Sequence, residues 1–137
     1  MTDLVEAYAA TVVSIALPGH GWVDAAKAVR TIGRPMHVVT AWNPGESRPG
    51  IGVNRGRNRD LRNRLAVPGT EIHCALGASP SGDHYEESYA ITGMSRADAL
   101  AVGREFGQAA IFEVTADNLV VVSSDGAWER RRPHEPS

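Results

Sequence analysis

Residues 40–65 read TAWNPGESRPGIGVNRGRNRDLRNRL, and no other stretch says as much about the fold. A strand is predicted to end at residues 41–42, a loop rich in proline and glycine follows, and a helix begins near residue 54. One face of that helix carries Asn54, Asn58, Leu61 and Leu65. The leucines predict that this face is buried, so the two asparagines need hydrogen-bond partners. A ligand is one candidate partner.

Positive charge is concentrated in the same stretch. Residues 48–64 carry six arginines against a single aspartate, whereas the whole chain has a net charge of −2. Arg57 lies one turn after Asn54, and an arginine near a helix N-terminus can bind a carboxylate or phosphate through two hydrogen bonds. The alternative is a solvated basic helix in which Asp60 pairs with Arg64.

Length and composition predict one domain with one core. The chain has 137 residues, 42% of them hydrophobic, as in most globular proteins. No apolar run approaches the ~18 residues of a membrane-spanning helix, and the first ten residues lack the basic segment of a signal peptide. A single cysteine, Cys74, excludes an internal disulfide. We therefore expect a cytoplasmic protein without a membrane partner.

Helices and strands are predicted to alternate along the chain. Periodicity and turn signals predict helices at 3–10, 23–32, 54–65 and 95–107, and strands at 11–17, 36–42, 71–76, 85–92, 109–115 and 119–123. This order predicts an α+β fold with a single mixed, largely antiparallel sheet of about five strands packed with three to four helices. We expect residues 1–128 to form a single α+β domain and residues 129–137 to be a flexible C-terminal tail.

Two adjacent carboxylates lie in the strand predicted at 85–92. Alternation sends Glu86 and Glu87 to opposite faces of the sheet. Glu87 shares its face with Tyr85 and Tyr89, so it is predicted to be partly buried and suited to general acid/base catalysis. Arg57 is the partner that we expect for Glu87. The alternatives are a structural ion pair and an exposed sheet face.

The remaining polar residues favour chemistry without a metal or a cofactor. The amide of Gln108 can donate and accept towards a ligand, or it can satisfy local backbone groups. The histidines lack the spacing of zinc ligands, and no glycine-rich phosphate loop occurs. Few aromatic residues accompany the basic helix and the chain is net acidic, which argues against a nucleic-acid partner.

Four motifs occur in a recognisable order: TAWNP at 40–44, N-x-x-R-N-x-x-L at 54–61, EES at 86–88 and GREFGQAAI at 103–111. Together they resemble a bacterial family known as domain of unknown function 3293. The resemblance implies a small cytoplasmic protein of one domain and names no activity. It singles out Asn43, Asn54, Arg57, Asn58, Glu87, Ser88 and Gln108. One departure is His84, where members of the family usually carry an aromatic residue.

These residues lead to the hypothesis of a small cofactor-independent enzyme of the hydrolase, lyase or isomerase type, acting on a small polar or anionic metabolite. Glu87 is the predicted general acid/base, Arg57 the anion anchor and Gln108 a further catalytic group. The predicted substrate-binding residues are Asn43, Asn54, Asn58 and Ser88. The alternative is a non-catalytic binding or regulatory module whose arginine-rich helix 54–65 contacts a protein or nucleic-acid partner. A homo-oligomer remains open in both cases.

Overall fold

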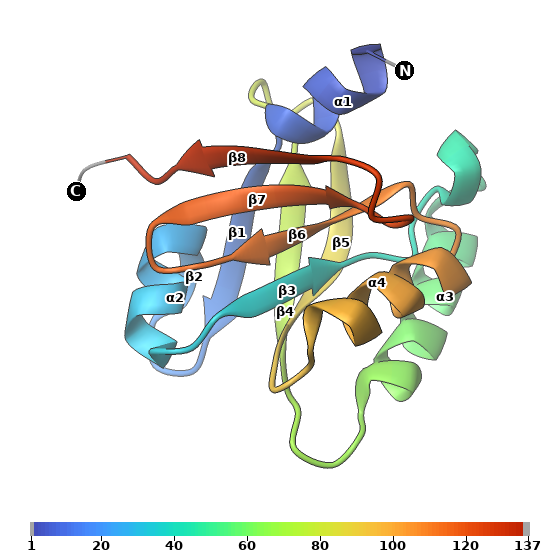
Figure 1. Cartoon of the computed structure of the whole chain (residues 1–137). Helices are drawn as coiled ribbons and strands as arrows, with labels where there is room; N and C mark the ends of the chain where they lie inside the picture. Colours follow the sequence, from blue (N-terminus) through green and yellow to red (C-terminus); the bar gives the residue numbers. More distant parts are fainter. Residues whose placement is uncertain (1, 136–137) are drawn as a thin grey trace.

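A computed structural model describes residues 2–135, in which eight strands form one antiparallel sheet curved into a half-barrel (Figure 1). The strands are β1 (Val12–Leu17), β2 (Gly21–Asp24), β3 (Met36–Val39), β4 (Glu71–Ala78), β5 (Tyr85–Thr92), β6 (Ala110–Val114), β7 (Asn118–Ser123) and β8 (Glu129–Pro133). Their order in the sheet is β2-β1-β4-β5-β3-β6-β7-β8. The α+β class and the four predicted helices are therefore confirmed.

Four α-helices and one short 3₁₀ helix complete the fold of residues 2–135. They are α1 (Thr2–Ala9), α2 (Ala25–Ile32), α3 (Ile51–Leu65), α4 (Arg96–Glu105) and the 3₁₀ helix η1 (Pro44–Glu46). Ser95 caps α4 as predicted, because its side chain accepts a hydrogen bond from the backbone N–H of Asp98.

The prediction of about five strands in a mixed sheet is wrong, because the sheet has eight strands and all neighbouring pairs are antiparallel. Strand β2 lies just before α2, partly within the range predicted as a helix, and Asp24 marks the true helix start by accepting from the N–H of Lys27. Strand β8 occupies the first five residues of the predicted flexible tail and pairs with β7. Residues 136–137 of that tail lie outside the described residues.

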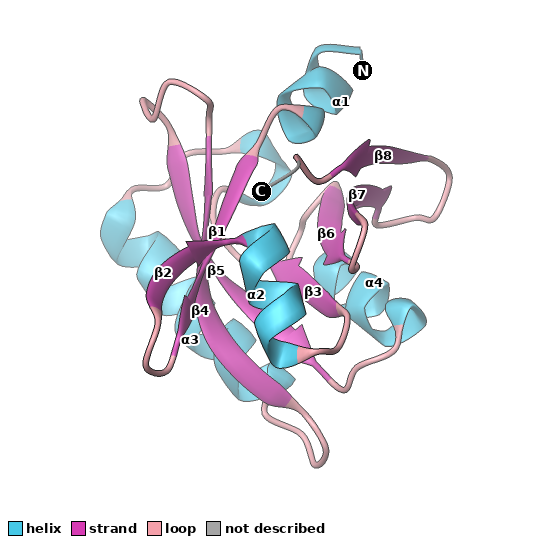
Figure 2. Ribbon diagram, turned by 90° about the vertical axis from the view of Figure 1, so that its left-hand side faces the viewer, coloured by secondary structure: helices cyan, strands magenta, loops and turns pink. Residues whose placement is uncertain are grey.

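The two faces of the sheet bury two separate cores. Helix α2 packs on one face (Figure 2), where its Ala28 and Val29 join Ile15, Met36 and other apolar residues of the strands. Helices α3 and α4 cover the other face, where Leu61 of α3 packs with residues of β3, β5 and β6. Because strand side chains alternate between faces, each central strand supplies residues to both cores.

Helix α1 lies beside the edge strand β8 (Figure 1). The guanidinium of Arg132 donates to the carbonyl oxygens of Ala9 and Thr11, at 2.6 and 2.8 Å, and Arg130 pairs with Glu6 at 3.5 Å. These contacts connect the end of α1 and the approach to β1 with the opposite edge of the sheet.

Candidate functional site

Buried asparagines of α3 hold the segment that follows β3. The prediction that Asn54 and Asn58 are buried is confirmed, with exposed fractions of 4% and 5%. Asn58 accepts from the backbone N–H of Ala41 at 2.8 Å and donates to the carbonyl oxygen of Glu87 at 2.7 Å. Asn54 exchanges two hydrogen bonds with Asn43, each 3.0 Å long. Protein groups therefore satisfy the polar atoms of both asparagines.

Arg57 and Gln108 join the same segment to the end of α4. Arg57 donates through Nε to the carbonyl oxygen of Ala41 at 2.8 Å and through a terminal nitrogen to that of Phe106 at 2.7 Å. Gln108, 7% exposed, donates through Nε2 to the carbonyl oxygen of Trp42 at 2.9 Å. Their hydrogen bonds therefore fix the geometry of residues 41–43.

A close backbone approach completes this arrangement. Gly107 has a φ of +73°, and a Cβ atom there would lie 2.9 Å from the Cβ of Pro44. The N–H of Gly45 also donates to the carbonyl oxygen of Gly107 at 2.9 Å. Position 107 thus needs a glycine twice over, for its φ and for its space.

Asn43 is the only described residue other than glycine with a positive φ, with φ 49° and ψ 54°. Asparagine tolerates this left-handed conformation better than most residues. The turn directs the side chain of Asn43 towards β5, where Nδ2 donates to Oε2 of Glu86 at 2.8 Å. A backbone conformation of this kind is a common feature of functional sites.

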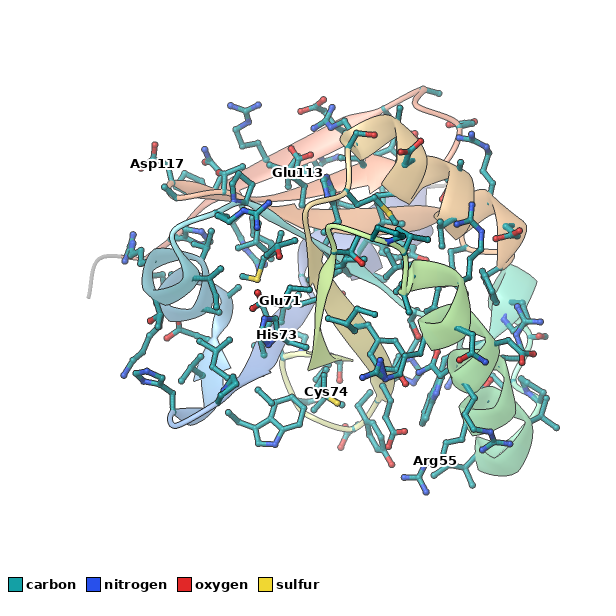
Figure 3. All side chains as sticks on the ribbon, turned by 90° about the horizontal axis from the view of Figure 1, so that it is seen from below. Arg55, Glu71, His73, Cys74, Glu113 and Asp117 are labelled. Atoms are coloured by element: carbon teal, nitrogen blue, oxygen red, sulfur yellow. The ribbon has the colours of Figure 1, made fainter. Side chains whose placement is uncertain are left out.

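Glu87 lies on the α3 side of the sheet and pairs with Arg55. The Nε and NH2 atoms of Arg55 donate to Oε1 and Oε2 of Glu87 at 3.1 and 2.8 Å. Figure 3 labels Arg55 beside the N-terminal half of α3. The expected pairing of Glu87 with Arg57 is therefore wrong, because Arg57 turns inward to backbone carbonyls.

A cavity of about 440 Å³ lies beside Asn43, on the face of β5 that carries Glu86. Its polar lining includes Thr40, Asn43, Arg48, His84, Glu86, Ser88 and Gln108. Its apolar wall comes from α1, β3 and β6. Three of the predicted site residues line it, namely Asn43, Ser88 and Gln108. The other four, Asn54, Arg57, Asn58 and Glu87, do not.

Four polar side chains form a continuous chain along the cavity. A terminal nitrogen of Arg48 lies 3.1 Å from Nδ1 of His84, and Nε2 of His84 lies 3.6 Å from Oε2 of Glu86. The same carboxylate oxygen accepts from Asn43. A guanidinium can only donate, so Nδ1 of His84 is the acceptor in the contact with Arg48, and Nε2 faces Glu86.

A family model described as "Protein of unknown function (DUF3293)" matches residues 39–111. The chain belongs to this family. The resemblance seen in the sequence motifs is thereby confirmed. No curated protein and no solved structure matches the chain.

The span matched to DUF3293 runs from the last residue of β3 to the second residue of β6. It contains all seven predicted site residues and also Arg48, His84 and Glu86. Most of the apolar wall, including α1, lies outside this span.

Sequence reasoning missed Arg48, His84 and Glu86 as lining residues. The signal for Glu86 was present, because alternation places it on the face of Ser88, which is buried and lines the cavity. His84 carried a weaker signal as the departure from the family pattern. Nothing in the sequence around Arg48 distinguished it from the arginines of α3.

Two further properties concern the rest of the described chain. Within residues 2–135 no helix is long and apolar enough to cross a membrane. Among the same residues no group of three or more His, Cys, Asp or Glu side chains is arranged to hold a metal ion.

A second polar network lies apart from the cavity, on the α4 side of the sheet. Glu113 accepts from Arg96 at 3.0 and 3.1 Å and lies 2.8 Å from Nε2 of His37. Burial raises the pKa of the Glu113 carboxyl. The hydrogen bonds from Arg96 and His37 lower the same pKa by more than burial raises it, so it lies below its ordinary value. The network joins α4 to β3 and β6 and has a structural role.

Proposed function

We propose that the cavity is the active site of a small enzyme of the cofactor-independent hydrolase, lyase or isomerase type, acting on a small polar metabolite. Glu86 is the general acid/base of this proposal. The observation that carries it is the placement of the Glu86 carboxylate in a cavity, with one oxygen held by Asn43 and the other without a partner among the described residues.

The free oxygen, Oε1, is the atom that would take or return a proton. Oε2 is occupied by the hydrogen bond from Asn43, which fixes the orientation of the carboxylate. A positioned carboxylate of this kind typically contributes ~10²–10⁴-fold to a rate. His84 lies beside the oxygen that Asn43 holds, with its Nε2 3.6 Å from Oε2 of Glu86, so it borders the site of the proposed proton transfer.

Arg48 supplies positive charge on the same wall. One of its terminal nitrogens is used by His84, so the other guanidinium N–H groups remain for an anionic group of the substrate or for negative charge that develops during the reaction. In this proposal Arg48 replaces Arg57 as the anion anchor, because the guanidinium of Arg57 already donates to two backbone carbonyl oxygens.

Glu87 is less suited to acid/base work than its neighbour. Both of its carboxylate oxygens accept from Arg55, and its side chain is 36% exposed, against 25% for Glu86. A carboxylate held by a guanidinium at a solvent-accessible surface is stabilised in its charged form and has no free oxygen directed into a cavity.

The experiment is a search for turnover with an isosteric variant. The wild-type protein is incubated in D₂O with a library of polar metabolites that includes carboxylic acids, amino acids, amides and esters, and consumption or deuteration is followed by ¹H NMR. We expect at least one compound to react, and Glu86→Gln to lower that rate by ~10²–10⁴-fold. Glu87→Gln is the matched control and should retain the rate. A full rate in Glu86→Gln contradicts the proposal.

The binding-module alternative has weaker support from the contacts of α3. Arg55 and Arg64 are paired with Glu87 and Glu105. Only Arg59 and Arg62 are exposed on this helix without an ion pair among the described residues. Two free cations make a small electrostatic footprint for a macromolecular partner.

A further inference from the structure

We infer that the ligand of the cavity is a zwitterion of amino-acid size with an apolar side chain. Its ammonium group is bound by Glu86 and Gln108, and its carboxylate is bound by Arg48. This inference names the substrate class of the active site proposed above and therefore rests on that proposal.

Gln108 presents an acceptor that the described residues leave unused. Its side chain is 7% exposed and lines the cavity, and its Nε2 donates to the carbonyl oxygens of Trp42 and Phe106. No described residue donates to its Oε1. Because both donors of this amide are turned to the backbone, its oxygen is left to accept from a donor group on a ligand.

Glu86 presents the second free acceptor, and it carries charge. Its Oε2 is held by Asn43, while Oε1 receives no hydrogen bond from a described residue. Glu86 is bound by the side chain of Asn43 and Gln108 by the carbonyl oxygen of Trp42, so consecutive residues of one turn hold both. An ammonium group has three donors and a positive charge, which matches one carboxylate and one amide oxygen. The proton that Oε1 of Glu86 takes or returns in the proposed function is then one of the protons of this ammonium group.

Arg48 provides the opposite charge at the other end of the polar chain. It is the only lysine or arginine among the described residues that line the cavity. The ring of His84 separates its guanidinium from Glu86, at 3.1 Å on one side and 3.6 Å on the other. A cation and an anion one side chain apart match the carboxylate and the ammonium of an amino acid, and the guanidinium can bind the carboxylate bidentately.

Most of the remaining wall is apolar, apart from Thr11 and Ser79. Tyr8 and Phe112 bring their ring centroids within 6.0 Å, and Val38 and Ala110 lie beside them in the lining. A volume of about 440 Å³ is within the range of pockets for small molecules. The side chain of the ligand is therefore apolar and contacts this wall, with its charged groups on the side of the 40–48 segment and β5.

The test compares three probes that differ by one charged group. L-leucine carries both groups, 4-methylpentanoic acid lacks the ammonium, and 3-methylbutylamine lacks the carboxylate. Binding is followed in ¹H–¹⁵N spectra through the side-chain amides of Gln108 and Asn43. We expect leucine to shift both amides and each truncated probe to bind roughly 10–100-fold more weakly, as for the loss of a hydrogen bond to a charged group.

Two variants assign the two ends of the ligand. Arg48→Met should reduce the affinity for leucine to the affinity for 3-methylbutylamine. The affinity for the amine itself should not change. Glu86→Gln should reduce the affinity for leucine and for the amine, but not for the acid. Arg59→Met and Glu87→Gln are the matched controls and should change none of the three affinities. Equal affinity for leucine and 4-methylpentanoic acid, or no amide shifts at tens of millimolar leucine, overturns the inference.

The outcome separates this inference from the proposed function. If the metabolite library gives a substrate that has no amine and whose turnover depends on Glu86, the proposed function stands and the inference of a zwitterionic ligand is wrong. If leucine binds with the expected selectivity while Glu86→Gln retains full turnover, the ligand class stands and the acid/base role of Glu86 is wrong.

Discussion

Asn43 and Glu86 are joined by a hydrogen bond of 2.8 Å from Nδ2 to Oε2, which connects the turn after β3 with the strand β5. The turn is fixed from behind, because Asn54 of α3 accepts from the backbone N–H of Asn43 and donates to its Oδ1. Helix α3 therefore acts on the cavity through this turn rather than by direct contact. The buried asparagines and Arg57 position the site without lining it.

The left-handed conformation of Asn43 predicts an unusual order of stability for two variants. Asn43→Ala and Asn43→Gly lose the same side-chain hydrogen bonds, but alanine resists a φ of 49° and glycine does not. We expect the glycine variant to be more stable by about 0.5–1 kcal/mol, after allowance for its greater freedom when unfolded. The measurement is the free energy of unfolding in urea. An alanine variant at least as stable as the glycine variant would show that the backbone at position 43 is unstrained.

Arg57 is predicted to matter for stability because it joins two carbonyl oxygens, those of Ala41 and Phe106. Arg57→Met leaves both acceptors without their charged donor and should lower the free energy of unfolding by roughly 2–4 kcal/mol. Arg59→Met removes an exposed arginine of the same helix and should change it by less than about 0.5 kcal/mol. Urea unfolding of both variants measures the difference. Equal stabilities would contradict the structural role of Arg57.

Glu113 predicts a dependence of stability on pH. The pKa of its carboxyl in the folded protein lies below the ordinary value of 4.5. The contribution of this carboxyl to the free energy of unfolding is therefore present above pH 4.5 and is lost as the pH falls through the lower pKa of the folded protein. The difference in Tm between the wild type and Glu113→Gln should therefore shrink below pH 4.5. Glu105→Gln removes an exposed partner of Arg64, and its difference in Tm from the wild type should change little with pH. Calorimetry between pH 7 and pH 3 measures the effect, and a constant difference for Glu113→Gln would contradict it.

Arg132 is predicted to hold α1 against the cavity. Its guanidinium donates to the carbonyl oxygens of Ala9 and Thr11, and Tyr8 of the same helix lines the apolar wall. Arg132→Ala should speed hydrogen exchange of the amides at residues 5–9 and leave those of α3 unchanged, because α1 opens locally. Arg131→Ala removes only a surface contact with Glu129 at 3.6 Å and is the control. Unchanged exchange in α1 would show that other contacts secure the helix.

Sequence patterns were sufficient for the helices and the central strands but not for the edges of the sheet. Helix α4 has a capping serine, and β5 has the bounds predicted for it, residues 85–92. Strand β8 consists of five exposed residues, ERRRP, and its pairing comes from backbone contacts with β7. Charged residues are frequent on edge strands, so such a strand has the composition of a loop. Its pairing becomes visible only when β7 is in place.

The candidate site shows the same limit. Alternation correctly separated Glu86 from Glu87, but it could not tell which face of β5 would border a cavity. The tyrosines at positions 85 and 89 made the Glu87 face look buried, and α3 does cover part of it. Glu87 lies at the margin of that contact, within reach of Arg55. The cavity depends on α1 and on the curvature of the whole sheet, and neither is encoded near position 86.

The central claim is that the substrate binds in the cavity at Glu86 and Gln108. The most direct test is a crystal structure of Glu86→Gln soaked with the compound that the wild type consumes. We predict electron density for that compound between position 86 and Gln108, with its anionic group at Arg48. Density on the outer face of α3, at Arg59 and Arg62, with an empty cavity would contradict the account.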